Sequence, residues 1–233
     1  MLLFGKPLEL LILDVDGVIV DVINHIRPAM IATAKRIGLS LEPLSEFWRS
    51  ETNRSRFCSG LQNQIRACWP HLDNQAVLDY CWRFQEERRR NPWRAISGSI
   101  EAINWFRENN ILLALCTTND RPTLINQLKT IDIDPAWFVA MSTWESGHPK
   151  PDPRAIEVIL KNTNVSRSHS AYIGDWYPDL IAARGAEIRF IAALSGGMPR
   201  EMFLNEGVPT DHIIERLSEF PKLLKKLVLR DRK

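Results

Sequence analysis

Short apolar runs recur along the chain, and each ends at polar residues. The first, residues 8–13, carries Glu9 as its only polar member, and four more lie at 111–116, 137–142, 170–173 and 189–194. Runs of this length are typical of strands that are buried on both faces of a parallel sheet. Helical patterns lie between them, as at 99–108. The alternation predicts an α/β fold with a doubly wound parallel sheet and a Rossmann-like core.

The stretch from residue 21 to residue 91 has a different pattern. Strand-like runs disappear, and apolar residues at helical spacing dominate at 29–37 and 76–84. We expect an inserted α-helical domain over 21–91, with the α/β core formed by 1–20 and 92–233. Pro92 suits the point where the chain re-enters the core. Near the C-terminus, residues 217–229 carry apolar residues at helical intervals, which predicts a helix with one face on the sheet.

Composition sets limits on the class of protein. With 233 residues and 45% hydrophobic content, the chain can form one substantial core and a smaller second one. The net charge of +2 is too small to indicate a nucleic-acid partner. No apolar run approaches the roughly 20 residues that cross a bilayer, so we expect a cytoplasmic protein without a membrane partner. The cysteines show no metal-binding spacing and are expected to be reduced thiols; they are Cys58, Cys68, Cys81 and Cys116.

Two carboxylates directly follow the first apolar run, in Asp14-Val15-Asp16-Gly17-Val18. Ligands bind at the carboxyl ends of strands in open α/β sheets. Residues two apart on a strand point the same way, so Asp14 and Asp16 would repel each other as anions unless a divalent cation relieved the repulsion. Taken alone, such a pair is also compatible with a solvated strand end.

A second acidic group follows the run at 170–173, in Gly174-Asp175-Trp176-Tyr177-Pro178-Asp179. Carboxylate oxygens suit Mg²⁺, which is usually held by few protein ligands together with phosphate oxygens. The two groups therefore predict a Mg²⁺ site. Asp179 has a second interpretation, because an acidic residue at the start of a helix also complements the helix dipole. The candidate metal ligands are Asp14, Asp16, Asp175 and Asp179.

Anion-binding chemistry lies between the two acidic groups. The run at 111–116 ends at Thr117-Thr118-Asn119, which offers hydroxyls and amides to an anion. Lys150 lies in Gly147-His148-Pro149-Lys150-Pro151-Asp152-Pro153, where prolines stiffen the segment around a long cationic side chain. Each has a plainer alternative, since Thr117 could cap the next helix and a lone lysine is usually solvated. The order along the chain is acid pair, hydroxyl, lysine, acid pair.

These four motifs, in this order, resemble those of the haloacid dehalogenase superfamily, and the resemblance covers nearly the whole chain. It is similar to the group of phosphoglycolate phosphatases and β-phosphoglucomutases that carry a helical cap. The resemblance implies that Asp14 is a nucleophile that accepts a phosphoryl group and that Asp16 is the general acid and base. It further implies that Thr117 holds a phosphoryl oxygen, that Lys150 bridges nucleophile and phosphate, and that Asp175 and Asp179 support the metal.

The inserted domain resembles the family's cap, which closes over the catalytic face and excludes water during turnover. A closing cap favours a small phosphorylated metabolite over a large or polymeric substrate. In this domain, Arg54 and Arg56 could bind an anionic part of the substrate. A solvated turn is the alternative for this segment. Thr118 and Asn119 complete the candidate substrate-binding residues.

Together these features predict a Mg²⁺-dependent phosphatase that works through an aspartyl-phosphate, as a monomer or homodimer. Two alternatives stay open. Val18 and Val22 stand where many phosphatases of the family have Thr and Ser, and a valine after the glycine also occurs in its sugar-phosphate mutases, so a β-phosphoglucomutase-like phosphomutase is one. The other is a non-catalytic binding protein that keeps the fold, for which the unusual Trp176 is the main support.

Overall fold

The computed structural model describes residues 2–3, 5–49, 61–90 and 92–224. The chain divides into two compact units. One unit combines Met1–Val22 with Trp93–Lys233, and the other is the single segment Ile23–Pro92. Each unit has its own hydrophobic core, and the two are described separately below.

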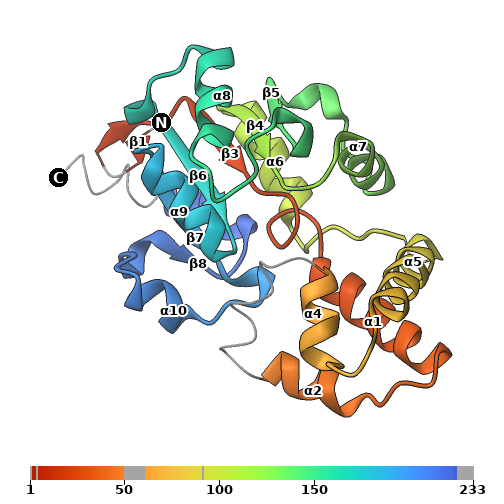
Figure 1. Ribbon diagram of the computed structural model, residues 1–233. Coiled ribbons are helices and arrows are strands. Elements are labelled where there is room, and N and C mark those ends of the chain that lie inside the picture. The colour runs from red at the N-terminus through yellow and green to blue at the C-terminus, as the bar shows by residue number, and fades with distance from the viewer. Residues whose placement is uncertain (1, 4, 50–60, 91, 225–233) are drawn as a thin grey trace. The chain divides into compact units, whose positions relative to one another are not determined.

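A six-stranded parallel sheet forms the centre of the first unit (Figure 1), which confirms the predicted α/β fold. The strand order is β5-β4-β3-β6-β7-β8, so the first strand of the sheet in sequence lies near its middle. In register, Leu13 of β3 pairs with Leu115 of β4 and Ile173 of β6. The strands are β3 (Leu10–Leu13), β4 (Leu112–Cys116), β5 (Ala140–Ser142), β6 (Ser170–Gly174), β7 (Arg189–Ala193) and β8 (Ile213–Ile214).

Helices cover both faces of this sheet, which explains why its strands are apolar without alternation. In β3, Leu11 and Leu13 join the core with α6 (Ser99–Glu108) and α7 (Arg121–Thr130). Leu10 and Ile12 join the opposite core. That core includes residues of α8 (Arg154–Thr163), α9 (Tyr177–Gly185) and α10 (Arg200–Asn205).

The remaining elements of this unit are short. A small antiparallel pair forms from β1 (Leu2–Leu3) and β2 (Lys6–Pro7). Single 3₁₀ turns are Pro135–Trp137, Trp144–Ser146, Arg167–His169, Leu194–Gly196, Thr210–His212 and Leu217–Glu219.

Most differences from the sequence-based expectation concern the ends of elements. The helix expected at 99–108 has these bounds, whereas the run at 137–142 opens with the turn Pro135–Trp137 and becomes strand only at Ala140. The short β8 was not expected, because two residues carry too little pattern. The expected helix at 217–229 begins with the turn Leu217–Glu219 and continues as helix over 220–224, and its remainder lies outside the described residues.

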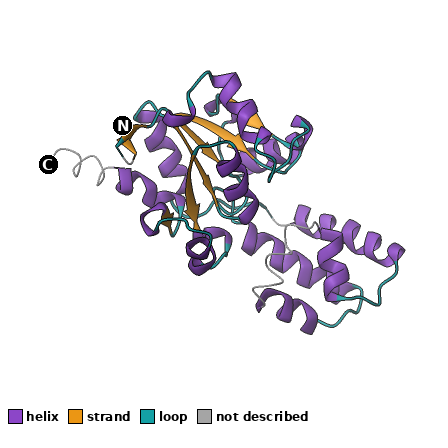
Figure 2. Ribbon diagram, turned by 60° about the vertical axis from the view of Figure 1, so that its left-hand side comes forward, coloured by secondary structure: helices purple, strands orange, loops and turns teal. Residues whose placement is uncertain are grey.

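In the described part of the second unit, the regular secondary structure consists of helices joined by turns and loops (Figure 2). Its helices are α1 (Val22–Arg36), α2 (Glu42–Arg49), α4 (Leu61–Cys68) and α5 (Asn74–Arg90). Trp69 and Tyr80 are buried in its core, with ring centroids 5.3 Å apart. The Tyr80 hydroxyl donates a 2.8 Å hydrogen bond to the Met30 carbonyl, and Arg36 of α1 forms ion pairs with Glu86 and Glu87 of α5.

The chain segments that lead into and out of the second unit run side by side in the first unit. The amide of Asp21 donates to the carbonyl of Arg94 at 2.9 Å, and the amide of Ile96 donates to the carbonyl of Ile19 at 2.8 Å. Val20 and Ala95 form an antiparallel bridge. The inserted unit thus leaves and rejoins the first unit at one place.

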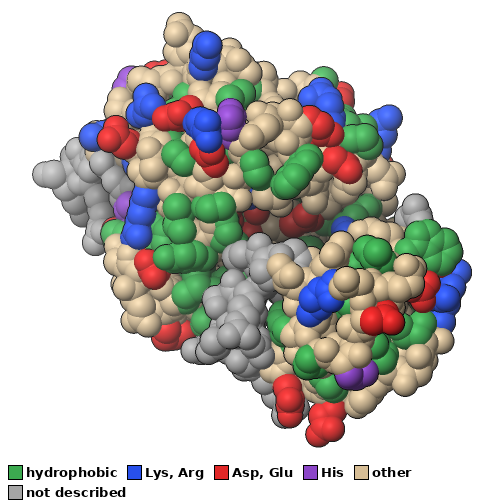
Figure 3. All heavy atoms as spheres, in the orientation of Figure 1, with side chains coloured by type: hydrophobic (Ala, Val, Ile, Leu, Met, Phe, Trp, Pro, Cys, Tyr) green, Lys and Arg blue, Asp and Glu red, His purple; other side chains and the backbone are tan. Residues whose placement is uncertain are grey.

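The surface carries charges of both signs. On the face in Figure 3, basic and acidic side chains are interspersed, in keeping with the net charge of +2.

Every helix in the described part of the chain is too short or too polar to span a bilayer.

Candidate active site

The candidate residues follow the central strands of the sheet directly. Asp14 follows β3, Thr117 follows β4 and Asp175 follows β6. Because these strands are parallel neighbours, their carboxyl ends meet at one edge of the sheet. Residues far apart in the sequence come together there.

Lys150 joins the two acidic groups. Its Nζ lies 2.8 Å from Asp14 Oδ1 and 2.6 Å from Asp179 Oδ1. The Tyr172 hydroxyl accepts a 3.0 Å hydrogen bond from Lys150 and donates at 2.8 Å to the same oxygen of Asp179. The Lys150 side chain is only 5% exposed, so it is not the solvated surface lysine that its position alone would favour. Asp179 also accepts a 3.0 Å hydrogen bond from the amide of Trp176 through Oδ2.

Asp175 lies against a cradle of glycine backbone. A Cβ atom added to Gly17 or to Gly196 would overlap Oδ2 of Asp175. Gly17 also has a φ of +84°, in the left-handed region that glycine tolerates. The Ser195 hydroxyl donates a 2.6 Å hydrogen bond to the Gly17 carbonyl, which fastens the loop after β7 to the loop after β3.

Burial and like charges perturb the acidic groups. Burial raises the pKa of Asp14 to about 7; the neighbouring acids also raise it, while Lys150 opposes them. Burial likewise raises the pKa of Asp175 well above its usual range, aided by the charges of Asp14 and Asp179. Burial alone would lower the pKa of Lys150, but the charges of Asp14 and Asp179 outweigh it and raise that pKa. With all three carboxyl groups ionised, the site would hold more negative charge than one lysine neutralises.

The donor set fits a hard divalent cation. Asp14, Asp175 and Asp179 are buried and each offers one carboxylate oxygen, with these atoms all within 4.8 Å of one another. Oxygen ligands of this kind suit Mg²⁺. The glycine cradle lets the backbone approach Asp175 closely. Both oxygens of Asp179 already have protein partners, and Oδ1 of Asp14 contacts Lys150 and the Val15 amide.

Asp16 lies apart from this cluster, although the sequence suggested that it joins the metal site. Its carboxylate accepts hydrogen bonds from two side-chain amides. Asn119 donates to Oδ2 at 2.7 Å, and Gln127 of α7 donates to Oδ1 at 2.7 Å. Among the described residues, the group of acids suited to a metal contains Asp14, Asp175 and Asp179 without Asp16.

The two threonines of the polar segment after β4 differ in burial. Thr117 is buried, and its Oγ1 accepts a 3.1 Å hydrogen bond from the amide of Asn119. The cap of α7 is Asp120, whose side chain accepts from the amide of Thr123 at 2.7 Å, so Thr117 does not cap this helix. Thr118 is exposed.

Two further candidates and the unusual tryptophan complete the sequence-based set. Arg54 and Arg56 lie outside the described residues. Trp176 is half-buried and packs against the core that contains Leu180.

Sequence reasoning missed Gln127, Tyr172 and Gly196. Gln127 interrupts the apolar face that Leu124 and Leu128 form on one helix, and a polar residue on such a face is a detectable signal. Tyr172 lies inside an apolar strand, so its hydroxyl gave no sign of a role. Gly196 follows β7, and only the fold brings it to Asp175.

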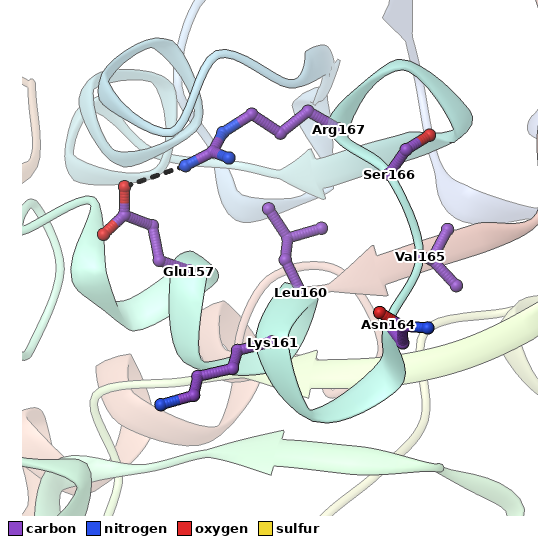
Figure 4. Close-up of a pocket in the computed structure, with 7 residues that line it drawn as sticks. All are labelled: Glu157, Leu160, Lys161, Asn164, Val165, Ser166 and Arg167. Carbon is purple, nitrogen blue, oxygen red and sulfur yellow. Dashed lines mark hydrogen bonds and ion pairs between the residues drawn. The ribbon is translucent and has the colours of Figure 1, made fainter.

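A separate pocket of about 530 Å³ lies on the first unit (Figure 4). The end of α8 and residues 164–167 line it. These residues precede β6, whereas Asp175 follows it, so the pocket belongs to the opposite edge of the sheet. Arg167 there is paired with Glu157 at 3.1 Å and donates to the Ala186 carbonyl, and the Lys161 side chain extends away from this pair toward the lower left of Figure 4. The residues that line this pocket do not include the buried acids and the lysine found at the carboxyl ends of the strands.

Comparison with known proteins identifies a family that matches most of the chain. Residues 11–193 match the haloacid dehalogenase-like hydrolase family. The pyrophosphatase PpaX of Listeria welshimeri is 28% identical over 122 residues, covering 52% of this chain and 55% of the pyrophosphatase. The chain thus matches about half the length of that relative. A phosphoglycolate phosphatase of Pseudomonas fluorescens is 24% identical over 203 residues, covering 82% of this chain and 71% of that enzyme.

Solved structures share the fold. A protein of Thermotoga maritima with the provisional name β-phosphoglucomutase has a TM-score of 0.75 at 22% identity, covering 94% of this chain and 99% of that one. The family match spans the strands that carry Asp14, Thr117 and Asp175, together with Lys150. This chain therefore belongs to the haloacid dehalogenase-like hydrolase family.

Proposed function

We propose that the protein is a Mg²⁺-dependent phosphatase that hydrolyses a small phosphorylated metabolite through an aspartyl-phosphate on Asp14. The observation that carries the proposal is the buried contact between Asp14 and Lys150 beside Asp175, at the carboxyl end of β3. A carboxylate attacks an anionic phosphate only where nearby positive charge offsets the repulsion. Lys150 supplies such charge directly at the nucleophile.

In the first step, an oxygen of Asp14 attacks phosphorus and the bond from phosphorus to the leaving oxygen breaks. Lys150 attracts the negatively charged phosphoryl oxygens and keeps Asp14 in place. The hydroxyl of Thr117 is our candidate donor to a phosphoryl oxygen. Asp16 gives a proton to the departing alcohol.

In the second step, water attacks phosphorus in the aspartyl-phosphate and restores the Asp14 carboxylate. Asp16, which lost its proton in the first step, takes one from the attacking water, and inorganic phosphate leaves. The two steps are balanced because Asp16 returns to its starting protonation state. The same side chain therefore acts as acid and then as base.

Asp14 and Asp175 would hold the Mg²⁺ ion, with Asp179 in support. When bound, the ion contributes positive charge to the phosphoryl group and offsets the crowded carboxylates. Asp179 holds Lys150 and accepts from the Trp176 amide, so its main part is to orient the lysine.

Release of inorganic phosphate from a panel of small esters tests the proposal. The panel holds 2-phosphoglycolate, glycerol 3-phosphate, glucose 1-phosphate, pyrophosphate and p-nitrophenyl phosphate, each assayed with Mg²⁺ and with EDTA. We expect Mg²⁺-dependent release from at least one ester and a loss of about 1,000-fold or more in Asp14→Asn, because the nucleophile is removed.

A matched control removes a carboxylate of no proposed role. Asp211 is exposed in the same unit, and Asp211→Asn should retain wild-type rates. Comparable release from Asp14→Asn and the wild type would contradict the assigned nucleophile. Binding of beryllofluoride with Mg²⁺, followed by ¹⁹F NMR, provides a second readout that needs no substrate. A wild-type protein that takes up neither metal nor beryllofluoride would instead be a non-catalytic member of the fold.

Transfer of the phosphoryl group back to a sugar is the second candidate reaction. The Thermotoga maritima structure with its provisional β-phosphoglucomutase name motivates it, through the shared fold alone. A phosphomutase would convert glucose 1-phosphate to glucose 6-phosphate, need a bisphosphate primer and release little inorganic phosphate. Coupled detection of glucose 6-phosphate distinguishes the two reactions.

A further inference from the structure

Gln127 is a fully buried amide on a helix face that is otherwise apolar. Its neighbours on that face of α7, Leu124 and Leu128, are also fully buried and belong to the core beneath the sheet. A buried amide without partners is costly. Hydrogen-bond partners must therefore offset the cost of burying the Gln127 amide.

Both ends of the Gln127 amide have a partner. Its Nε2 donates to Asp16 Oδ1 at 2.7 Å, and its Oε1 accepts from Asn119 Nδ2 at 3.0 Å. Asn119 Nδ2 also donates to Asp16 Oδ2 at 2.7 Å. The three side chains form a closed ring of hydrogen bonds that we call the Asp16 ring.

This ring fixes the direction of the Asp16 carboxyl group. Each oxygen accepts from a different element, one from the loop after β4 and the other from α7. A carboxyl group held at both oxygens loses rotation about its last torsion. General acid catalysis depends on such orientation, because the proton must be delivered along a defined line.

We infer that Gln127 is a positioning residue, which acts through Asp16 to aim its carboxyl group at the leaving oxygen of the substrate. The inference rests on the proposed phosphatase function and adds a residue from α7 to it. Asn119 fulfils the same purpose from the other side, so its side chain serves Asp16 where the sequence suggested substrate binding.

The test compares two leaving groups in one enzyme preparation. p-Nitrophenolate departs readily without a proton, whereas the alkoxide of an alkyl phosphate needs one. In Gln127→Met, which keeps a long unbranched side chain without the amide, kcat/KM should fall about 10- to 100-fold for the alkyl phosphate that the wild type hydrolyses fastest. For p-nitrophenyl phosphate we expect a loss below about 3-fold.

The comparison is insensitive to partial misfolding, because inactive protein lowers both rates by the same factor. Asn126→Leu removes an amide from the adjacent exposed position of α7 and should leave both rates unchanged. Gln127→Glu keeps the shape of the side chain but places a carboxylate beside Asp16. It should show the same selective loss, which makes a second variant available if Gln127→Met folds poorly.

A double variant tests whether Gln127 works through Asp16. In an Asp16→Asn background, Gln127→Met should cause no further loss of kcat/KM for the alkyl phosphate, because the group it positions is already gone. Equal losses for both leaving groups, or additive losses in the double variant, would overturn the inference while leaving the phosphatase proposal intact. Absence of Asp14-dependent phosphate release in the wild type would overturn both.

Discussion

At the scale of single residues, charge crowding dominates the molecule. Asp14, Asp175 and Asp179 share one small buried volume with a single lysine. Buried ion pairs contribute little net stability, but removal of one partner leaves uncompensated charge and is strongly destabilising. Lys150 should therefore matter for folding as well as for chemistry.

Lys150→Met should lower the free energy of unfolding by about 3 kcal/mol when the protein is kept in EDTA. The remaining carboxylates then lose their only cationic partner among the described side chains that contact them. Urea unfolding followed by circular dichroism measures the change. Added Mg²⁺ should recover part of the loss, because a bound cation stabilises the folded state.

Lys161→Met is the matched control for this prediction, since Lys161 lies exposed on α8. It should change stability by less than about 0.5 kcal/mol. Equal stabilities of the two variants in EDTA would mean that Lys150 does not compensate the acidic cluster.

The sequence predicted which residue types gather at the strand ends better than it predicted their contacts. The contacts of Asp14, Lys150 and Asp175 agree with expectation, because strand-end motifs are local patterns and the sheet brings them together. The contacts of the Asp16 carboxylate differed from expectation. Its hydrogen-bond partner Gln127 comes from another element, more than a hundred residues away in sequence. Contacts of that kind leave no local pattern. The catalytic roles of all these residues remain predictions.

At the scale of elements, loops that follow neighbouring strands support one another through glycine. Gly17, in the loop after β3, and Gly196, in the loop after β7, both lie against Asp175. The strands themselves were predictable from apolar runs, since burial on both faces dictates their composition. The mutual approach of these loops was not, because it depends on strand order.

Gly17→Ala should destabilise the protein more than Gly38→Ala. Both glycines have a left-handed backbone, with φ of +84° and +75°, so each substitution costs about 1–2 kcal/mol in backbone strain. Only the new methyl group at position 17 would also overlap Asp175. We expect an additional loss of at least about 1 kcal/mol there, measured by urea unfolding.

The same substitution should weaken the metal site. If Asp175 moves away from the added methyl group, the Mg²⁺ concentration that gives half-maximal stabilisation should rise in Gly17→Ala and stay at the wild-type value in Gly38→Ala. Gly38 has open space around it, so it reports backbone strain alone. Indistinguishable metal dependence in the two variants would count against the cradle around Asp175.

At the scale of the whole molecule, one continuous unit is inserted into another. The second unit has its own buried core, and the segments that flank it are hydrogen-bonded to each other within the first unit. Chain ends held so closely are easy to reconnect with little entropic cost. The first unit should therefore fold without the insert.

A variant in which a short Gly-Ser linker replaces residues 23–92 should unfold cooperatively and bind beryllofluoride with Mg²⁺ through Asp14. The linker need only join residues whose neighbours, Asp21 and Arg94, already touch. Differential scanning calorimetry and ¹⁹F NMR provide the measurements. The separate segment 23–92 should be helical by circular dichroism. A non-cooperative first unit would show that its folding requires the insert.

The central position of β3 also affects the order in which parts of the chain can fold during synthesis. This strand is made first among the six of the sheet, yet its partners β4 and β6 come only after the inserted unit. While the chain grows on the ribosome, the strand that leads to Asp14 stays unpaired, whereas the insert already has every residue of its own core. The helical unit is thus the first part that can fold. Until β4 and β6 emerge, the edges of β3 stay unpaired and can form hydrogen bonds with other exposed strands.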